Sequence, residues 1–570
     1  MRREKANTID REELRLRLGY GSRRQFISRA LAAGFALSAA SAIADDAHAG
    51  AKNQRERRAD MQWRYDYIVV GGGTAGCILA DRLSEDGRYS VLLLERGGRD
   101  FRDDDIVEPL AWPSLLGSRF DYGADRLSTP QQGLNRRRLA INGGRVLGGS
   151  SSTNAMIWQV GDERDFRDWE ERAGPRWGSD SMFRIARRIK IDPIKSSADQ
   201  GLTQPYLDAH AEQGFRRIDV NASRRIDGVS ILDTNIRRSR RFTPVQAYLF
   251  PALSRRNLTV VANVALERLD LNGGRCAGVH CTRDGRPMHV AAGEVVLTSG
   301  AVETPAILMR SGIGPRRTLQ QAGVNTVVDS PQVGRNLKDH ALLPGPVFEA
   351  ASDLPPLQGQ GISTVAYFNP RGARRSPSLQ FLGTQFALGD FPNPARSCSV
   401  LPGLMKPRSQ GRLSITGPSL SDPLSVNPNY LTRDADVEDV LQGFRIARHI
   451  GGSRALADFR LSEIFPGPTA TSDAALVDFI RSSINTYFHY VSTCAMGRDE
   501  RAVLDPKLRV RGVENLRVAD ASAIPEITAS NTHVPTMLIA EKAAQIIRRD
   551  TRRASGIQQV ASADFAEAVD

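Results

Sequence analysis

The feature that most constrains the fold of this chain is a glycine-rich segment near its start, YDYIVVGGGTAGCILADRLSEDGRYSVLLLERGG at residues 65–98. An apolar run at 67–70 predicts a buried strand, and a helical apolar pattern follows it. Three glycines between them have the G-x-G-x-x-G spacing: Gly71, Gly73 and Gly76. A second strand at 90–94 ends at Glu95, about twenty residues past the glycines. This order predicts a βαβ unit that binds a dinucleotide.

Each glycine of this unit meets a separate steric need. Gly71 makes the tight turn, Gly73 lets the backbone approach a pyrophosphate, and Gly76 lets the helix pack against the strand. The helix N-terminus then faces the phosphates, whose charge it stabilises. Glu95 can accept a hydrogen bond from a ribose hydroxyl, which argues against a 2′-phosphate. Taken alone, the unit does not distinguish NAD from FAD, and a ligand-free unit of the same fold is the alternative.

Composition and charge narrow the class of protein. A chain of 570 residues is too long for one typical domain and predicts two intertwined domains. Its net charge of +13 is spread over scattered arginines without a nucleic-acid motif, so we expect a solvated surface and no nucleic-acid partner. The odd number of five cysteines, without a C-x-x-C pair, predicts buried thiols in place of a disulfide framework. No metal-ligand spacing is present, so no metal site is expected.

The first 49 residues have the features of a targeting segment. SRRQFIS precedes the Ala-rich run ALAAGFALSAASAIA and the small-residue pattern AHAG, which predicts cleavage after Ala49. Arg23 and Arg24 resemble a twin-arginine export signal, which implies a periplasmic or otherwise exported protein. The apolar run is too short to span a bilayer comfortably, so we expect no membrane span. A buried helix or an uncleaved anchor is the alternative.

The remainder of the chain alternates strand and helix patterns. A polar linker at 50–64 precedes the βαβ unit, and a dense glycine cluster occupies 142–156. Two strands joined by an Asn-Gly-Gly turn are expected near 258–282, followed by a strand at 294–298 and a helix. Alternating apolar runs within 342–485 predict a largely antiparallel sheet. The last helix is expected from Pro535, with a frayed tail after Arg549.

Several segments together resemble the glucose-methanol-choline (GMC) oxidoreductase family, flavoproteins that oxidise alcohols. They are GGRVLGGSSSTNAMIW with the later Asp165 and Trp169, GAVETPAILMRSGIGP, VGRNLKDH, YFHYVSTCAMG, and the closing DPKLRVRGVENLRVADASAIPEITASNTHVPT. The resemblance extends from residue 65 to about residue 547 and favours FAD over a nicotinamide cofactor. It implies a Rossmann-like α/β domain assembled from discontinuous segments and a second domain, of α+β type, with an antiparallel sheet.

By the same resemblance the chain divides into alternating segments. The FAD-binding domain comprises 65–161, 251–341 and 489–549, and the substrate domain comprises 162–250 and 342–488. The export signal at 1–49, the linker at 50–64 and a flexible tail at 550–570 lie outside both. The sequence gives no indication of the oligomeric state.

The resemblance also implies which residues hold FAD. They are Gly71, Gly73, Thr74, Ala75, Gly76, Glu95, Gly148, Gly149, Ser150, Asn154, Ala155, Met156, Leu266, Asp520, Ala521, Thr532, Val534, Pro535 and Thr536. In members with covalently attached flavin a histidine precedes the asparagine of the NAM triplet, and here that position is Thr153. We therefore expect tightly bound, noncovalent FAD.

Two histidines match the catalytic positions of the family. His489 corresponds to the active-site base, because an imidazole with a pKa near neutrality suits removal of a hydroxyl proton. His533 corresponds to the second position, where it is expected to bind the alkoxide. The other six histidines, His340 of the NLKDH motif among them, are expected to be structural. Cys494 is expected to be a small buried side chain and not a nucleophile.

The implied reaction is the oxidation of a primary or secondary alcohol to a carbonyl compound. Electrons would pass to a quinone or a cytochrome, or to O2, and the sequence does not distinguish a dehydrogenase from an oxidase. Tyr490 and Ser492 replace the proline and glycine usual in the first histidine motif, so Tyr487, Phe488 and Tyr490 either line an aromatic pocket or pack beneath the base. A hydroxynitrile-lyase-like member with a non-redox flavin is the alternative function.

Overall fold

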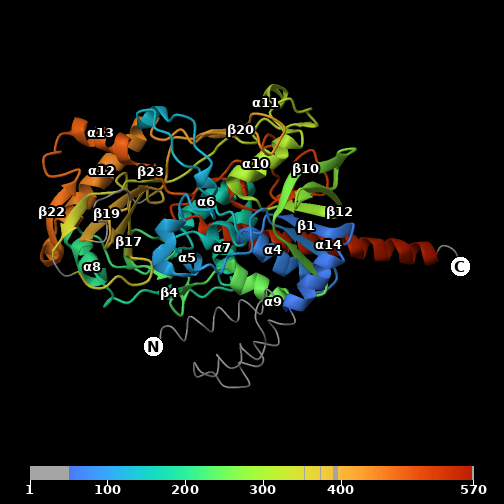
Figure 1. The fold of residues 1–570 in the computed structure, drawn as a ribbon, viewed down its shortest axis with the longest axis horizontal. Coiled ribbons are helices and arrows are strands. Elements are labelled where there is room, and N and C mark those ends of the chain that lie inside the picture. Colours follow the sequence, from blue (N-terminus) through green and yellow to red (C-terminus); the bar gives the residue numbers. More distant parts are fainter. Residues whose placement is uncertain (1–49, 352–353, 373, 389–395, 568–570) are drawn as a thin grey trace, which may run out of the picture.

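A computed structural model describes residues 50–351, 354–372, 374–388 and 396–567, so the expected export signal lies outside the described residues. Two β-sheets lie beside one another, each with its own helices (Figure 1). In this view the sheet that contains β1, β10 and β12 is on the right, and the sheet that contains β17, β19 and β22 is on the left.

The first sheet has a parallel core. Its strands run in the order β9, β2, β1, β12 and β24, all paired in parallel: β9 (Leu258–Val261), β2 (Val91–Leu94), β1 (Arg64–Val70), β12 (Arg286–Leu297) and β24 (Leu516–Val518). Two further strands, β10 (Val264–Asn272) and β11 (Arg275–Arg283), add an antiparallel meander to the N-terminal half of β12. The predicted turn between them is present, with Gly273 and Gly274 at positive φ. Strands β2 and β9 are buried along their whole length, and the C-terminal ends of β1 and β12 are apolar and buried.

The helix after the glycines sits as the motif predicts. Helix α4 (Thr74–Ser84) begins directly after Gly73 and packs between β1 and α14 (His533–Glu567). A Cβ added at Gly76 would lie 1.8 Å from the carbonyl oxygen of Gly71, so only glycine permits this approach of helix to strand. Directly after β12 the chain forms α10 (Gly300–Arg310), the helix expected there.

The second sheet is antiparallel in every pairing. Its main path is β22, β16, β19, β18, β17 and β5, and two short strands, β15 and β23, join beside β19. Their bounds are β5 (Gly228–Ile231), β15 (Ala341–Leu342), β16 (Val347–Ala350), β17 (Ile362–Phe368), β18 (Leu379–Thr384), β19 (Ser397–Leu404), β22 (Arg460–Phe465) and β23 (Asn485–Thr486). The expected combination of a Rossmann-like α/β domain and an antiparallel-sheet domain is confirmed.

Helices cover the outer face of this second sheet. They are α8 (Thr203–Glu212), α12 (Asp434–Gly451) and α13 (Asp473–Ser483), which surround β19 and β22 in Figure 1. Two more helices, α6 (Glu163–Ala173) and α7 (Ser179–Ala186), pack against one another, and α7 packs against α14. The inner face of the second sheet is therefore left to face the first domain, which places a site between them.

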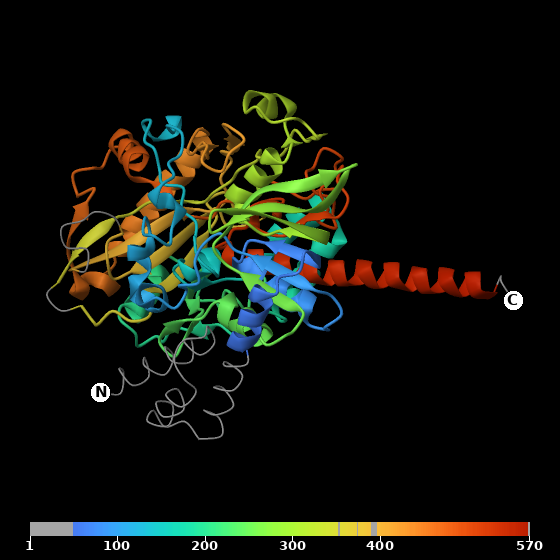
Figure 2. The ribbon, with the colours of Figure 1, turned by 45° about the vertical axis from the view of Figure 1, so that its right-hand side comes forward.

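Two segments that were expected to lie outside both domains are helical. The expected linker at 50–64 is helical over 50–59, and Gln54 fixes it to the first domain. The Gln54 amide donates to the carbonyls of Leu253 (3.1 Å) and Leu258 (2.8 Å) and accepts from the Val260 N–H (2.9 Å). The expected flexible tail continues α14 to Glu567, beyond the body of the molecule (Figure 2). The tail has few aromatic residues, but its Ala-, Gln- and Arg-rich composition favours a helix.

The expectation for the cysteines agrees with the structure, whereas the apolar run for which a membrane span was considered lies outside the described residues. All five cysteines are buried and unpaired. Among the described residues, no helix combines the length and the apolarity needed to cross a bilayer.

Candidate functional site

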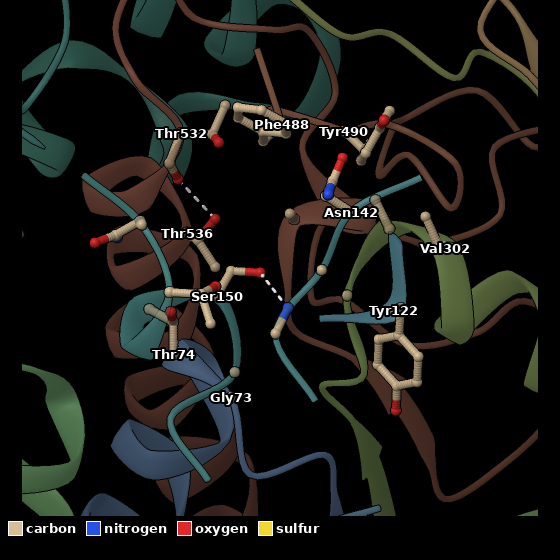
Figure 3. A pocket seen from close by; sticks show the side chains of 18 of the residues that line it. Gly73, Thr74, Tyr122, Asn142, Ser150, Val302, Phe488, Tyr490, Thr532 and Thr536 are labelled. Atoms are coloured by element: carbon tan, nitrogen blue, oxygen red, sulfur yellow. Dashed lines mark hydrogen bonds between the residues drawn. The ribbon is translucent and has the colours of Figure 1, made fainter. Parts of the chain in front are cut away.

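A long cavity of about 310 Å³ lies between the two sheets. Residues of β1 and β2 line one part of it, and residues of β15, β17, β18 and β19 line another. In Figure 3, Gly73, Thr74 and Tyr122 lie toward one end, and Phe488 and Thr532 lie toward the other. A cavity of this shape suits an extended ligand whose two ends meet different chemical surroundings.

At the end of the cavity near Gly73, the wall is backbone without side chains. Gly149 has a φ of +54°, and a Cβ added there would lie 2.9 Å from the Cα of Gly73. Gly71 has a φ of +108°, and its Cβ would lie 2.7 Å from the carbonyl oxygen of Thr298. Two glycine loops from distant parts of the chain thus meet with no side chains between them. This cradle, at the N-terminus of α4, fits the pyrophosphate of the FAD that the sequence implies.

Two carboxylates of the cavity wall have partners that fix their orientation. Glu95 accepts from the N–H groups of Gly72 (2.7 Å) and Gly97 (2.6 Å), and burial raises its pKa to about 7. Asp520 accepts from Gly300 N–H (2.8 Å), Thr304 Oγ1 (2.6 Å) and the N–H of Ser522 (2.8 Å). Both oxygens of Asp520 are therefore engaged in holding α10 and the 520–523 turn beside the cavity.

Most residues implied to hold FAD line this one cavity, although their segments are far apart in sequence. These are Gly71, Gly73, Thr74, Ala75, Glu95, Gly149, Ser150, Asn154, Ala155, Leu266, Asp520, Ala521, Thr532 and Thr536, together with His489 and His533. Five do not line it: Gly76, Gly148, Met156, Val534 and Pro535. The Val534 side chain packs in the first hydrophobic core, and the Met156 side chain packs in the core beside the second sheet. Gly76 and Gly148 act through close packing behind the wall.

The NLKDH segment (336–340) holds His489 in position. His340, which was expected to be structural, contacts the ring of His489 directly. Backbone bonds join Lys338 and Val491, with the Val491 N–H donating to the Lys338 carbonyl at 2.9 Å. The Asp339 carboxylate accepts from the backbone N–H of His489 at 2.7 Å. His340 Nδ1 lies 2.9 Å from His489 Nδ1. One motif thus holds both the backbone and the ring of the expected base.

These contacts determine which nitrogen of His489 carries its proton. His340 Nε2 lies 2.9 Å from the carbonyl oxygen of Thr528, and because a carbonyl only accepts, this nitrogen must carry a hydrogen. Burial, and then the neighbouring His489, lower the pKa of His340 well below its usual value, so the ring is neutral and its Nδ1 is an acceptor. His489 must therefore donate from Nδ1. Its Nε2 keeps a lone pair.

A second chain of hydrogen bonds leads to the same tautomer. The Tyr487 hydroxyl donates to Gln380 Oε1 at 2.6 Å, and Gln380 Nε2 donates to Asn531 Oδ1 at 3.0 Å. The Asn531 amide nitrogen is thereby turned toward His489 Nε2, at 3.3 Å, and can only donate to it. Both chains leave His489 Nε2 as an acceptor. Burial lowers the pKa of His489 to about 3, so the ring is neutral near pH 7.

His533 begins α14 and lines the same cavity. Its ring meets Trp158 edge to face, with centroids 6.2 Å apart, and its Nε2 has no hydrogen-bond partner among the described residues. A buried polar atom without a partner indicates that a ligand completes the site. Burial, with a smaller effect from Arg241, lowers the pKa of His533 to about 4, so this ring is also neutral.

The aromatic residues around His489 both line the cavity and support the base. Tyr487, Phe488 and Tyr490 all line the wall, and the Tyr487 ring packs on His489 with centroids 4.4 Å apart. The sequence left open whether these rings line a pocket or pack against the base, and the structure shows both in one cluster. Cys494 is fully buried, and burial raises its thiol pKa well above the usual value, which excludes a thiolate nucleophile.

Sequence reasoning missed several residues that the structure brings to the site. Asn531 and Gln380 orient one another, Phe386 and Leu401 line the cavity from the second domain, and Trp112 lines it from the 65–161 segment. For His340 and Asn531 a signal existed, because both belong to motifs that carried the resemblance. The others come from a short helix, a loop and strands without a motif, and only the folded chain brings them to the cavity.

Comparisons with known proteins agree with this geometry. GMC oxidoreductase family models match residues 65–342 and 407–540. The chain is 33% identical to an alcohol dehydrogenase [acceptor] of Pseudomonas putida, over 86% of this chain and 97% of that protein. It is also 33% identical to an oxygen-dependent choline dehydrogenase of Staphylococcus saprophyticus, over 86% and 95%. The crystal structure of pyridoxine 4-oxidase from Mesorbium loti superposes with a TM-score of 0.81 at 34% identity, covering 84% of this chain and 98% of that one.

The family models together match more than half of the chain, and the relatives align over nearly their whole length. Family membership implies FAD as the cofactor, in agreement with the glycine cradle. The chain is therefore an enzyme that belongs to the GMC oxidoreductase family.

Proposed function

We propose that this enzyme oxidises a primary or secondary alcohol to the carbonyl compound, with His489 as the general base. The observation that supports this most directly is the Nε2 lone pair of His489, which two separate hydrogen-bond chains leave unprotonated at the cavity wall. A positioned base of this kind contributes about a hundredfold to ten-thousandfold in rate.

Three residues have separate roles at the alcohol oxygen: His489 accepts the proton, and Asn531 and His533 form hydrogen bonds. The hydroxyl donates its proton to His489 Nε2, in the place that the Asn531 amide occupies at 3.3 Å. The Asn531 N–H is then available to the alcohol oxygen, and His533 Nε2 supplies the second contact. After proton transfer, His489 still donates from Nδ1 to His340, and this hydrogen bond stabilises the positive charge of the protonated ring. Bound FAD supplies the hydride acceptor for the substrate carbon.

The cofactor is proposed to be tightly bound and noncovalent. Thr153 lines the cavity at the position where family members with attached flavin carry a histidine, and a threonine hydroxyl offers no comparable nucleophile. Acid precipitation of the purified yellow protein should release all of the flavin to the supernatant. Flavin that remains in the washed pellet would contradict this.

The electron acceptor is proposed to be a quinone or a cytochrome, with O2 as the alternative. The relative named alcohol dehydrogenase [acceptor] supports a non-oxygen acceptor, whereas the relative named oxygen-dependent choline dehydrogenase supports O2. Enzyme reduced anaerobically by an alcohol should be reoxidised faster by a quinone analogue than by air. The opposite order of rates would identify an oxidase.

Export by the twin-arginine route is also proposed, on the basis of Arg23, Arg24 and the small residues before Gly50. Expression in a bacterium should give mature protein in the periplasmic fraction. Replacing both arginines by lysine should retain the protein in the cytoplasm.

The proposed oxidation is tested by an anaerobic screen of aryl, aliphatic and sugar alcohols, in which reduction bleaches the flavin absorbance. At least one alcohol should bleach the wild type, and His489→Ala should slow bleaching at least a hundredfold while FAD stays bound. His449→Ala, at an exposed histidine of α12, is the matched control and should leave the rate unchanged. Cyanohydrin cleavage without bleaching by any alcohol would instead favour the lyase-like function.

A further inference from the structure

The part of the cavity beside the second sheet has an apolar wall. Four neighbouring strands contribute one aliphatic side chain each, and a short 3-10 helix (Pro109–Leu115) and the loop after β18 contribute one aromatic ring each. We call this part the apolar chamber: Leu342, Ile362, Leu382, Leu401, Trp112 and Phe386. The Trp112 and Phe386 rings meet edge to face with centroids 6.3 Å apart.

The polar atoms beside this chamber are occupied by the protein itself. The Trp112 indole N–H donates to the carbonyl of Gln360 at 3.1 Å. The Tyr487 hydroxyl donates to Gln380 at 2.6 Å. Neither ring therefore offers its donor to a ligand, and each presents an apolar face. His489, Asn531 and His533 line the same cavity and can hydrogen-bond a hydroxyl group.

No carboxylate of the described cavity wall is free to pair with a cationic substrate. Glu95 and Asp520 are engaged by backbone N–H groups, as described above. Asp121 accepts from the N–H groups of Gly117 (2.8 Å) and Gly143 (2.8 Å), and Glu303 pairs with Arg96, Arg126 and Arg310. None of these acids belongs to the hydrophobic cluster that forms the chamber.

A buried cation stands near the same site without a counter-ion. Arg241 is 3% exposed and donates to the carbonyl of Ile106 at 2.7 Å and to Asn154 Oδ1 at 2.9 Å. Among the described residues no carboxylate pairs with it, and its field reaches His533, whose pKa it helps to lower. Its positive charge opposes the entry of a second cation into a low-dielectric cavity.

Aromatic rings can bind a quaternary ammonium ion by cation–π attraction, so this alternative has to be weighed. Such contacts recover only part of the hydration that a cation loses on burial, and the remainder requires a carboxylate. The chamber has no such carboxylate among its described residues, and it has the uncompensated Arg241 nearby. The balance therefore disfavours a cation here even though rings are present.

We propose that the substrate is an uncharged alcohol whose hydroxyl is attached to an apolar body, either an aromatic ring or a medium-length alkyl chain, and that the apolar chamber binds this body. The inference rests on the proposed alcohol oxidation and specifies its substrate class. Choline-like cations and polyhydroxylated sugars are poor substrates, because the first lack a counter-charge and the second lack hydrogen-bond partners in the chamber.

The holoenzyme is tested anaerobically with benzyl alcohol, 1-hexanol, choline and glucose. Benzyl alcohol or hexanol should reduce the flavin with a specificity constant at least a hundredfold above that for choline and glucose. Faster reduction by choline or glucose would overturn the substrate class while leaving the proposed oxidation intact.

Unreactive probes separate the two proposals. Toluene should perturb the flavin spectrum or compete with the best alcohol, whereas tetramethylammonium should do neither at a tenfold higher concentration. If no alcohol bleaches the flavin but toluene still binds, the oxidation fails and the apolar chamber stands. If tetramethylammonium binds better than toluene, the proposed substrate class is wrong whatever the redox result.

Variants locate the binding to the chamber. Phe386→Ala should raise the dissociation constant for benzyl alcohol about tenfold, and Phe386→Leu, which retains bulk, should raise it less. Leu461→Ala, at a side chain of β22 that is 56% exposed and outside the cavity, is the matched control and should change nothing. An unchanged dissociation constant in Phe386→Ala, with the fold intact by circular dichroism, would place the substrate body elsewhere and contradict the proposal.

Discussion

His340 Nδ1 lies 2.9 Å from His489 Nδ1, and this contact between two imidazole rings sets the protonation of the base. His340 Nε2–H donates a hydrogen bond to the carbonyl of Thr528, so Nδ1 of His340 can only accept from His489. The proton-accepting nitrogen of His489 is thus fixed by a residue that does not line the cavity.

Removing this acceptor should disturb the tautomer of the base. In His340→Ala, we expect the rate of flavin reduction to fall on the order of tenfold to a hundredfold. The nitrogen-15 NMR signals of His489 should show Nδ1–H in the wild type and a mixture of tautomers in the variant. His340→Gln, which offers both an acceptor and a donor, should recover part of the rate. A purely structural role would lower stability but leave the His489 signals unchanged.

The pH dependence of substrate oxidation should lack a histidine-type limb. Because burial lowers the pKa of His489 to about 3, the base is unprotonated from about pH 5 upward, and protonation removes activity only as the pH falls toward that value. The rate constant for anaerobic reduction at low substrate concentration should therefore be constant between pH 5 and pH 8. A limb with an apparent pKa near 6.5 would show that the base is solvated.

The glycine cradle should tolerate no side chain at Gly149. A Cβ there would meet Gly73 Cα at 2.9 Å, so Gly149→Ala should lose FAD, measured as the ratio of flavin to protein absorbance. Gly87→Ala is the matched control, because Gly87 also has a positive φ of +73° but nothing within 4 Å of an added Cβ. Both variants incur a backbone cost of about 1 kcal/mol, and only the first closes the cradle. Equal FAD content in the two would contradict the predicted contact.

Stability in acid should depend on a histidine far from the cavity. His210 is fully buried, its Nδ1 lies 2.7 Å from the carbonyl oxygen of Tyr206, and burial lowers its pKa to about 4. Since the unfolded chain protonates this ring near pH 6.5, its stabilising effect is complete above pH 6.5 and is lost as the pH falls toward 4. In His210→Phe, the slope of unfolding free energy against pH between 4.5 and 6.5 should shrink by up to about 1.4 kcal/mol per pH unit. Urea unfolding at several pH values measures this, with His449→Ala as the unaffected control.

Local sequence patterns are sufficient to predict several elements of the first domain. Apolar runs and the glycine spacing predict β1, α4 and β2, because a strand needs a continuous apolar face and the tight turn needs positive φ at Gly71. The same reasoning located the hairpin turn at 272–274 and the antiparallel second sheet. His489 and His533 were identified by motif, and both line the cavity.

Tertiary structure alone decided the partners of those residues. His340 and His489 are 149 positions apart, and Gln380 and Asn531 are 151 apart, so no local pattern encodes either contact. The helix at 50–59 likewise depends on Gln54 reaching carbonyls about 200 residues away. Hydrogen bonds and apolar walls of this kind form only where distant segments are packed against one another. The base's tautomer and the apolar chamber are therefore properties of the folded chain, whereas the glycine turn is a property of its residues.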